Sequence, residues 1–291
     1  MSTLFQQQFK AYGELIESYL QGLPWPSDAL SQGMCYSLMS GGKRIRPVLA
    51  LAATTAVGGE VRQILPAAAA LEFIHTYSLI HDDLPAMDND DYRRGRLANH
   101  KVFGEAHAIL AGDALLTYAF ELLAMPLPVP PEVQLRVIRE VAQAAGPQGM
   151  VGGQVADLAG EGKTLTLAEV ERIHQKKTGA LLAVSARLGA ILGGGTEQAI
   201  EALTCYAQAL GLAFQIKDDI LDVEGDSAVL GKPAGSDVRQ GKSTYPALLG
   251  LDGAKEHLSR QVALAKDALA ELGASASFLR DLADFVAARQ R

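Results

Sequence analysis

Two clusters of aspartates, more than a hundred residues apart in the chain, carry the strongest chemical signal in this sequence. The first cluster contains Asp82, Asp83 and Asp88, and the second contains Asp218, Asp219 and Asp222. Each one closes a stretch that is too apolar for an exposed helix face, so an ordinary solvated charge run explains the pair poorly. The only basic residue next to the second cluster in the sequence is Lys217. Both clusters therefore suggest carboxylates that bind a cation.

Magnesium suits these clusters better than calcium does. Mg²⁺ usually takes one or two carboxylates and completes its octahedron with water and substrate phosphate, whereas no twelve-residue calcium loop is present. Asp218 and Asp222 are four apart and share one face of a helix. Asp82 and Asp88 are six apart, and they can converge because Pro85 is expected to interrupt the helix between them.

Two basic runs could bind anions. The segment 41–47, Gly-Gly-Lys-Arg-Ile-Arg-Pro, joins a flexible turn to Lys43, Arg44 and Arg46, and Arg93 and Arg94 follow Asp88 by five and six residues. Arginine presents a planar fork to phosphate oxygens and lysine a point charge, so together they can hold a diphosphate without a metal. Either run alone is explained equally well by a surface position.

Four polar residues interrupt apolar helix faces. His75 lies two helical turns before Asp82 and is either a diphosphate contact or a core histidine. Lys177 is the hardest to explain structurally, because a lysine rarely enters such a face without an anion beside it. Thr178 and Gln215 need partners if they are buried, and structural hydrogen bonds would serve as well as a ligand.

The composition is that of a folded protein without a broad nucleic-acid surface. The 291 residues are 48% apolar and 20% charged, and the formal net charge is −7. Binding to a nucleic-acid backbone needs a surplus of Lys and Arg, so we expect no nucleic-acid partner. The two cysteines are too few for a disulfide framework, and we find no signal peptide and no uncharged apolar stretch of about 18 residues. We therefore expect a cytoplasmic protein with no membrane insertion.

The periodicity of apolar residues predicts helices throughout. A three-to-four residue spacing runs from Leu4 to Leu20, and a similar pattern runs from Glu197 to Leu221 and stops near Gly225. Thr166 and Glu169 form a capping box ahead of a helix predicted to run past Leu188. Gly-rich or Pro-rich breaks are expected near residues 22–26, 58–59, 126–131, 146–153, 193–195 and 231–235. Because strand patterns are essentially missing, we predict one all-α domain, residues 1–291, with about ten or more helices.

In this order, the motifs resemble the trans-prenyltransferases of isoprenoid synthesis, the polyprenyl synthetase family, and most closely its bacterial farnesyl diphosphate synthases. The resemblance spans nearly the whole chain. It rests on segments 41–47, 75–88, 93–95 (Arg-Arg-Gly), 177–179 (Lys-Thr-Gly), 214–222 and 231–246, the last of which begins Gly-Lys and ends Lys-Ser-Thr-Tyr-Pro. Single motifs of this kind recur by chance, but the full ordered set does not.

The resemblance implies a helical bundle around a deep central cavity, a homodimer, and three Mg²⁺ ions per active site. The ions would bind Asp82, Asp88 and Asp218. The allylic diphosphate would be held by Arg93, Lys177, Lys232 and Lys242. Isopentenyl diphosphate would be held without metal by Gly42, Lys43, Arg46, His75 and Arg94. The resemblance also implies which residues are catalytic, namely Asp82, Asp88, Asp218, Lys177, Thr178 and Gln215.

The implied reaction joins isopentenyl diphosphate to dimethylallyl or geranyl diphosphate, with farnesyl diphosphate as the product. Breaking the allylic C–O bond leaves a carbocation and a highly charged diphosphate, which metals and lysines would stabilise. By analogy with the family, the departing diphosphate removes the final proton. Four residues separate Asp83 from Asp88, which is the spacing of bacterial members.

Product length depends on the depth of the cavity. In the family, residues about one turn before the first aspartate close the cavity floor. Here Tyr77, with Ser78 beside it, lies about 7.5 Å below Asp82 along the helix, so a bulky tyrosine should stop growth at farnesyl. Tyr77 could instead be plain core packing.

Three other functions remain open from the sequence. A geranylgeranyl diphosphate synthase would differ only in cavity depth. A terpene cyclase would bind one diphosphate and carry a different second metal motif, and a non-catalytic helical protein would leave both acidic clusters without partners.

Overall fold

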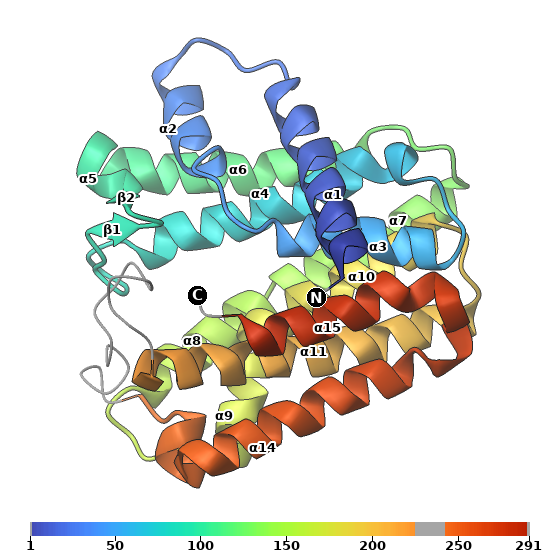
Figure 1. The fold of residues 1–291 in the computed structure, drawn as a ribbon. Coiled ribbons are helices and arrows are strands. Elements are labelled where there is room, and N and C mark those ends of the chain that lie inside the picture. Colours follow the sequence, from blue (N-terminus) through green and yellow to red (C-terminus); the bar gives the residue numbers. More distant parts are fainter. Residues whose placement is uncertain (1, 225–241, 290–291) are drawn as a thin grey trace.

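The computed structural model describes residues 2–224 and 242–289, and these form an all-α bundle of more than ten α-helices (Figure 1). The α-helices are α1 (Thr3–Gln21), α2 (Ala29–Leu38), α3 (Ile45–Ala56), α4 (Leu65–Asp82), α5 (Asn99–Phe103), α6 (Glu105–Ala124), α7 (Pro131–Ala145), α8 (Met150–Gly160), α9 (Leu167–His174), α10 (Ala180–Leu192), α11 (Glu197–Glu224), α14 (Tyr245–Ala268) and α15 (Ser277–Ala288). Shorter elements are η1 (Val61–Ile64), η2 (Gln175–Gly179), η3 (Ala270–Ala276), β1 (Tyr92–Arg93) and β2 (Arg96–Leu97). The predicted fold class is confirmed.

The local start signals act as the sequence predicted. Helix α1 covers the predicted stretch from Leu4 to Leu20. At the start of α9 both bonds of the capping box form, with the backbone N–H of Thr166 donating to Glu169 Oε2 at 2.8 Å and the backbone N–H of Glu169 donating to Thr166 Oγ1 at 3.4 Å. These bonds satisfy donors that the first turn of a helix leaves unpaired.

The core is built from helices that carry small residues. Helices α3, α4 and α10 contain runs of buried alanine, and these allow neighbouring backbones to approach closely. At one such contact a methyl group added to Gly189 of α10 would lie 3.0 Å from Ala50 Cα of α3, so glycine is needed there. The outer helices α1, α14 and α15 complete the bundle around this centre (Figure 1).

The structure differs from the predicted helix pattern in two places. The break predicted over residues 146–153 ends earlier, because α8 begins at Met150 and holds Gly153 inside the helix. A methyl group on Gly153 would lie 2.6 Å from Lys177 Cα, so the glycine serves a close helix contact and not a turn. The short β1–β2 hairpin was not predicted, since two-residue strands leave no alternating pattern.

The helix predicted from Thr166 past Leu188 is continuous but not regular. Between α9 and α10, residues 175–179 form a π-helical turn, η2, which contains Lys177 and Thr178. A π turn inserts an extra residue into the α-helical repeat and often marks a functional site. The even 3.6-residue stripe expected through Lys177 is therefore displaced at that residue.

Among the described residues, two helices meet the length and hydropathy criteria for a membrane span, although neither is the uncharged apolar stretch of about 18 residues sought in the sequence. They are α6, whose best window has a mean hydropathy of 1.3, and α11, with 1.2. In α11 56% of the window is buried inside the bundle, and in α6 39%. Core helices of bundles meet the same criteria, and burial identifies α11 as one of them. Helix α6 keeps Ile109 and Leu110 exposed.

Candidate active site

A large cavity opens between α3, α4, α6, α8 and η2. Its volume is about 550 Å³, which is large enough for a sizeable organic ligand. Apolar side chains of α4, α6 and α8 form most of its wall, and polar side chains of α3, α4, α8 and η2 also line it. The residues from the sequence analysis that line it are Arg46, His75, Tyr77, Ser78, Asp82, Lys177 and Thr178. The chain thus brings residues from three separate motifs, in segments 41–47, 75–88 and 177–179, to one cavity.

The first aspartate cluster turns back on itself at the end of α4. Asp82 is the last residue of the helix, and the backbone N–H of Asp88 donates to the Asp82 carbonyl oxygen at 2.9 Å. The turn through Pro85 therefore brings the two aspartates together, as predicted. Burial, together with neighbouring Asp88 and against the opposing effect of Lys177, raises the pKa of Asp82 to about 6. A nearby cation would stabilise the charged form of a carboxylate whose pKa is raised in this way.

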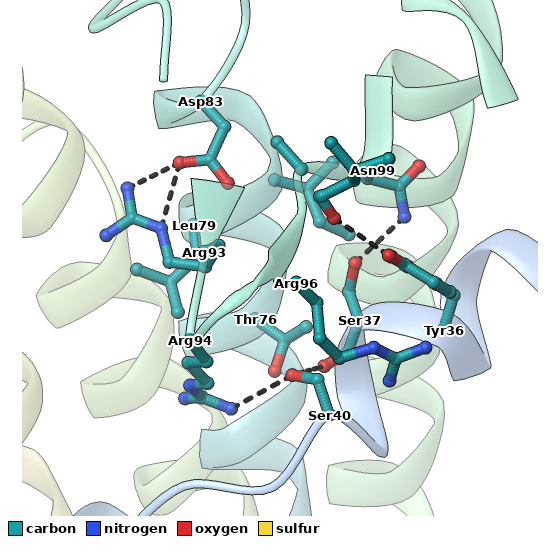
Figure 2. Close-up of a pocket in the computed structure, with 13 residues that line it drawn as sticks. Tyr36, Ser37, Ser40, Thr76, Leu79, Asp83, Arg93, Arg94, Arg96 and Asn99 are labelled. Carbon is teal, nitrogen blue, oxygen red and sulfur yellow. Dashed lines mark hydrogen bonds and ion pairs between the residues drawn. The ribbon is translucent and has the colours of Figure 1, made fainter. Parts of the chain in front are cut away.

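Asp83 has a structural role that differs from the proposed role of Asp82 and Asp88. It is buried, and it accepts hydrogen bonds from Arg93, one of them from Nε at 2.9 Å (Figure 2). Arg93 ends β1, and the turn to β2 places Arg94 and Gly95 at positive φ, as tight hairpin turns require. Asp83 thereby fixes an arginine whose charge also acts on Asp82.

In the second cluster only Asp218 is substantially exposed. Its side chain is 43% exposed, whereas Asp222 is buried and Asp219 is buried and accepts the backbone N–H of Tyr245 at 2.9 Å. Gln215 donates to Asp218 Oδ2 at 3.2 Å. The expectation that only Lys217 could pair with this cluster is wrong, because Arg289 donates to Asp218 Oδ1 at 2.8 Å. That residue lies 71 positions away, so no local pattern reveals it.

The donor chemistry of the clusters fits magnesium. Within the described residues, no three His, Cys, Asp or Glu side chains lie close enough to hold a metal ion by themselves. Mg²⁺ does not need such a cage, because it usually binds one or two carboxylates and shares substrate phosphate oxygens. Such a shared site suits Asp82 and Asp88, which the turn brings together. It also suits the partly exposed carboxylate of Asp218, which already attracts a cationic side chain.

The basic segment 41–47 separates into structural and cavity-facing residues. Arg44 is buried, and all three of its nitrogens donate at 2.7 Å, to Glu17, Glu72 and the Leu38 carbonyl. It therefore anchors the segment. Two residues on, Arg46 lines the cavity, and its Nε has no hydrogen-bond partner among the described residues. Burial lowers the pKa of Arg46 to about 10, against the opposing effect of Glu72.

His75 and Arg94 add to this cationic region. Burial, and then Arg46 and Arg94, hold the pKa of His75 well below its usual range, so the imidazole is neutral near pH 7. Arg94 donates to the Gly41 carbonyl and reaches toward Ser40 (Figure 2). A methyl group at Gly42 would lie 2.7 Å from Arg94 Cζ, so Gly42 leaves room for that guanidinium. Arg46 and Arg94 both lower the pKa of His75, and cations gathered around a neutral imidazole in this way favour an anionic ligand.

Lys177 has a protein partner that the sequence did not reveal. Its Nζ donates to Asp157 Oδ2 of α8 at 2.6 Å. Burial disfavours the charged lysine, but Asp157 outweighs it, so the pKa of Lys177 is raised. One turn earlier on α8, Gln154 lines the cavity, and its Nε2 has no hydrogen-bond partner within the part of the chain that the structure describes. A polar pair at i and i+3 on an apolar helix was the only available signal for these two residues.

Of the two lysines predicted in the segment 231–246, only Lys242 belongs to the part of the chain that the structure describes. Lys242 lines a smaller pocket with Asp157 and His174, and is not among the residues that line the large cavity. Lys232 lies outside the described residues. Lys43 lies three residues before the cavity-facing Arg46 in the sequence, and it is likewise not among the residues that line the large cavity.

Tyr77 lines the cavity below Asp82. It is buried, and its ring meets the His81 ring edge-on with 5.7 Å between centroids. Ser78 lines the cavity as well, and its hydroxyl donates to the His75 carbonyl at 2.9 Å. Burial, with Asp82 nearby, raises the pKa of Tyr77 to about 12, so the phenol stays neutral.

Comparison with known proteins places this arrangement in a family. The sequence profile of the Polyprenyl synthetase family matches residues 27–274. Farnesyl diphosphate synthase of Geobacillus stearothermophilus is 52% identical over 285 residues, covering 97% of this chain and 96% of that protein. Geranylgeranyl pyrophosphate synthase 7 of Arabidopsis thaliana is 48% identical over 265 residues, covering 90% of this chain and 76% of that one.

A solved structure agrees with the sequence comparison. Geranyltransferase of Helicobacter pylori, crystallised with magnesium and isoprenyl diphosphate, superposes with a TM-score of 0.86 at 31% identity, covering 98% of this chain and 97% of that one. The family profile covers more than half of the chain, and the relatives match it nearly end to end. This chain belongs to the polyprenyl synthetase family.

Proposed function

We propose that this protein condenses isopentenyl diphosphate with dimethylallyl and then geranyl diphosphate, giving farnesyl diphosphate and inorganic diphosphate. The observation that carries the proposal is one mostly apolar cavity whose lining includes residues of two differently built candidate anion sites. One site has the carboxylates of Asp82 and Asp88 with Lys177 nearby, and the other has Arg46 with His75 and Arg94. Two diphosphates and one hydrocarbon chain fit this division of charge.

In the proposed reaction the acidic clusters and Lys177 act on the allylic diphosphate. Magnesium held by Asp82, Asp88 and Asp218 would neutralise the charge that develops on the leaving group as the C–O bond breaks. Lys177, held by Asp157, and Arg93, held by Asp83, keep their cationic groups in place without reorganisation during the reaction. We further propose three ions per site, with Lys232 and Lys242 also holding this diphosphate.

The arginine site would hold isopentenyl diphosphate so that its double bond faces the cation. Arg46, Arg94 and His75 would bind the second diphosphate without metal, with Gly42 and Lys43 at the same turn. The walls of α4, α6 and α8 exclude water that would otherwise trap the cation. We propose that Thr178 and Gln215 face the cation with their oxygens, and that the departing diphosphate accepts the proton.

Tyr77 is proposed to stop chain growth at farnesyl, with Ser78 beside it. Tyr77→Ala should therefore lengthen the product, because removing the ring deepens the cavity beneath Asp82. The measurement is chain-length analysis of the dephosphorylated alcohols, and we expect geranylgeraniol or longer alcohols to replace most of the farnesol. Tyr118→Ala on α6 removes a tyrosine that packs outside this cavity, against Phe73 and Trp25, and is the matched control. An unchanged product from Tyr77→Ala would mean that Tyr77 serves only core packing.

The relatives support farnesyl over geranylgeranyl as the product. The farnesyl diphosphate synthase of Geobacillus stearothermophilus matches along 96% of its length, whereas the Arabidopsis geranylgeranyl synthase matches along 76%. A magnesium-bound neighbour of the same fold supports the choice of metal.

We also propose that residues 1–291 act as one cytoplasmic domain. Two copies would pair as a homodimer through α6, whose Ile109 and Leu110 are exposed.

The experiment that tests this function measures diphosphate release against substrate consumption. With Mg²⁺ and both substrates present, one inorganic diphosphate should appear for each isopentenyl diphosphate consumed. With geranyl diphosphate alone, release should be negligible; rapid release would indicate a terpene cyclase. No release with folded protein, Mg²⁺ and both substrates would favour a non-catalytic protein.

A further inference from the structure

The C-terminal Arg289 lies on the second acidic cluster, in a place that neither proposed diphosphate site assigns to it. It follows directly after α15, which runs back toward the end of the bundle where α11 finishes (Figure 1). Its Nη2 donates to Asp218 Oδ1 at 2.8 Å and to the Phe214 carbonyl at 2.8 Å. The guanidinium also stacks over the Phe214 ring, with Cζ 3.9 Å from the centroid.

This contact is more than a surface ion pair. The side chain of Arg289 is only 5% exposed, so its charge has been removed from water, while that of Asp218 is 43% exposed. A buried charge needs a partner, and Asp218 is the carboxylate that Arg289 contacts. The guanidinium therefore occupies one of the two oxygens that a divalent cation would use.

We propose that Arg289 is an internal counter-cation for Asp218, which competes with the divalent cation at the second acidic cluster. Without metal it neutralises Asp218 and docks the end of α15 on α11. When a cation binds, Arg289 gives up Asp218 Oδ1 but keeps the Phe214 carbonyl and ring, so the end of α15 stays docked. The inference rests on the proposed metal role of Asp218.

The test measures metal binding without turnover. Thermal unfolding is followed at a fixed concentration of inorganic diphosphate while MgCl₂ is increased, and the Mg²⁺ concentration at half-maximal protection is recorded. For Arg289→Gln this concentration should fall by about threefold or more, because a competing ion pair of this partial exposure has been removed. Arg289→Lys keeps the charge and should stay close to the parent protein.

Two further variants make the result specific. Arg260→Gln removes an exposed arginine on α14 that pairs with Glu256, and should leave the Mg²⁺ requirement unchanged. In an Asp218→Asn background, Arg289→Gln should have no effect on the Mg²⁺ requirement, because the shared carboxylate is gone. If Arg289→Gln does not fold, Arg289→Met keeps the apolar stem over Phe214 and replaces it.

Each outcome decides the question. If Arg289→Gln leaves the Mg²⁺ concentration at half-maximal protection unchanged, Arg289 only docks the end of α15. If that concentration rises, Arg289 holds Asp218 ready for the metal. Either result overturns the proposal that Arg289 competes with the metal. A parent protein with no Mg²⁺-dependent protection would instead refute the proposed metal site itself.

Discussion

Asp82→Asn is expected to lower kcat on the order of a thousandfold, because it weakens the metal site that stabilises the departing diphosphate. Asparagine keeps the shape of the side chain but removes its charge. The turn should persist, since it is the backbone carbonyl of residue 82 that accepts the Asp88 N–H. The measurement is steady-state turnover of geranyl and isopentenyl diphosphates at saturating Mg²⁺.

The matched control for this change is Asp252→Asn, which makes the same substitution at an exposed position of α14. That variant should keep the parent kcat. The metal-free site should also survive in Asp82→Asn, so protection by inorganic diphosphate without Mg²⁺ should be retained. A kcat within tenfold of the parent would contradict the assignment of Asp82 to the metal.

Arg46→Gln is expected to raise the KM for isopentenyl diphosphate by about tenfold or more, the worth of a lost charge-assisted hydrogen bond. Arg46 lines the cavity and its Nε has no hydrogen-bond partner among the described residues, so it is available to a ligand. The KM for geranyl diphosphate should change little, because that diphosphate is proposed to bind at the acidic clusters. Both constants come from initial rates with one substrate varied at a time.

A second arginine provides the comparison. Arg62→Gln removes an exposed charge on η1 and should leave both KM values unchanged. If Arg46→Gln raised the KM for geranyl diphosphate equally, Arg46 would contribute general attraction to anions and not a separate site. That result would contradict the division of the cavity into two diphosphate sites.

The sequence predicted the fold class because helix signals are local. Apolar spacing located α1 and α11, and the Thr166–Glu169 capping box located the start of α9 to the residue. The π turn at 175–179 could not be predicted in this way, because apolar spacing does not register a single extra residue in a helix or the close contact of Lys177 with Gly153 of another helix. The extent of α8 was misjudged for the same reason, since its glycines looked like turn residues.

The sequence identified charges in the site better than it identified their partners. It placed Asp82, Arg46 and Lys177 in the site by type and spacing, and all three line the cavity. It did not identify Asp157 or Arg289, because each reaches its partner only through tertiary folding. Arg44 looked like a ligand-binding arginine in the sequence, but the fold turns it inward to Glu72.

The most direct test of the proposed function is the chain length of the product. The protein is incubated with Mg²⁺, dimethylallyl diphosphate and isopentenyl diphosphate, and the alcohols are analysed after dephosphorylation. Farnesol as the main product is the predicted result, because Tyr77 lines the cavity below Asp82 and is proposed to close its floor. Geranylgeraniol would keep the mechanism and contradict the role of Tyr77, and no elongated alcohol from folded protein with Mg²⁺ would contradict prenyl transfer itself.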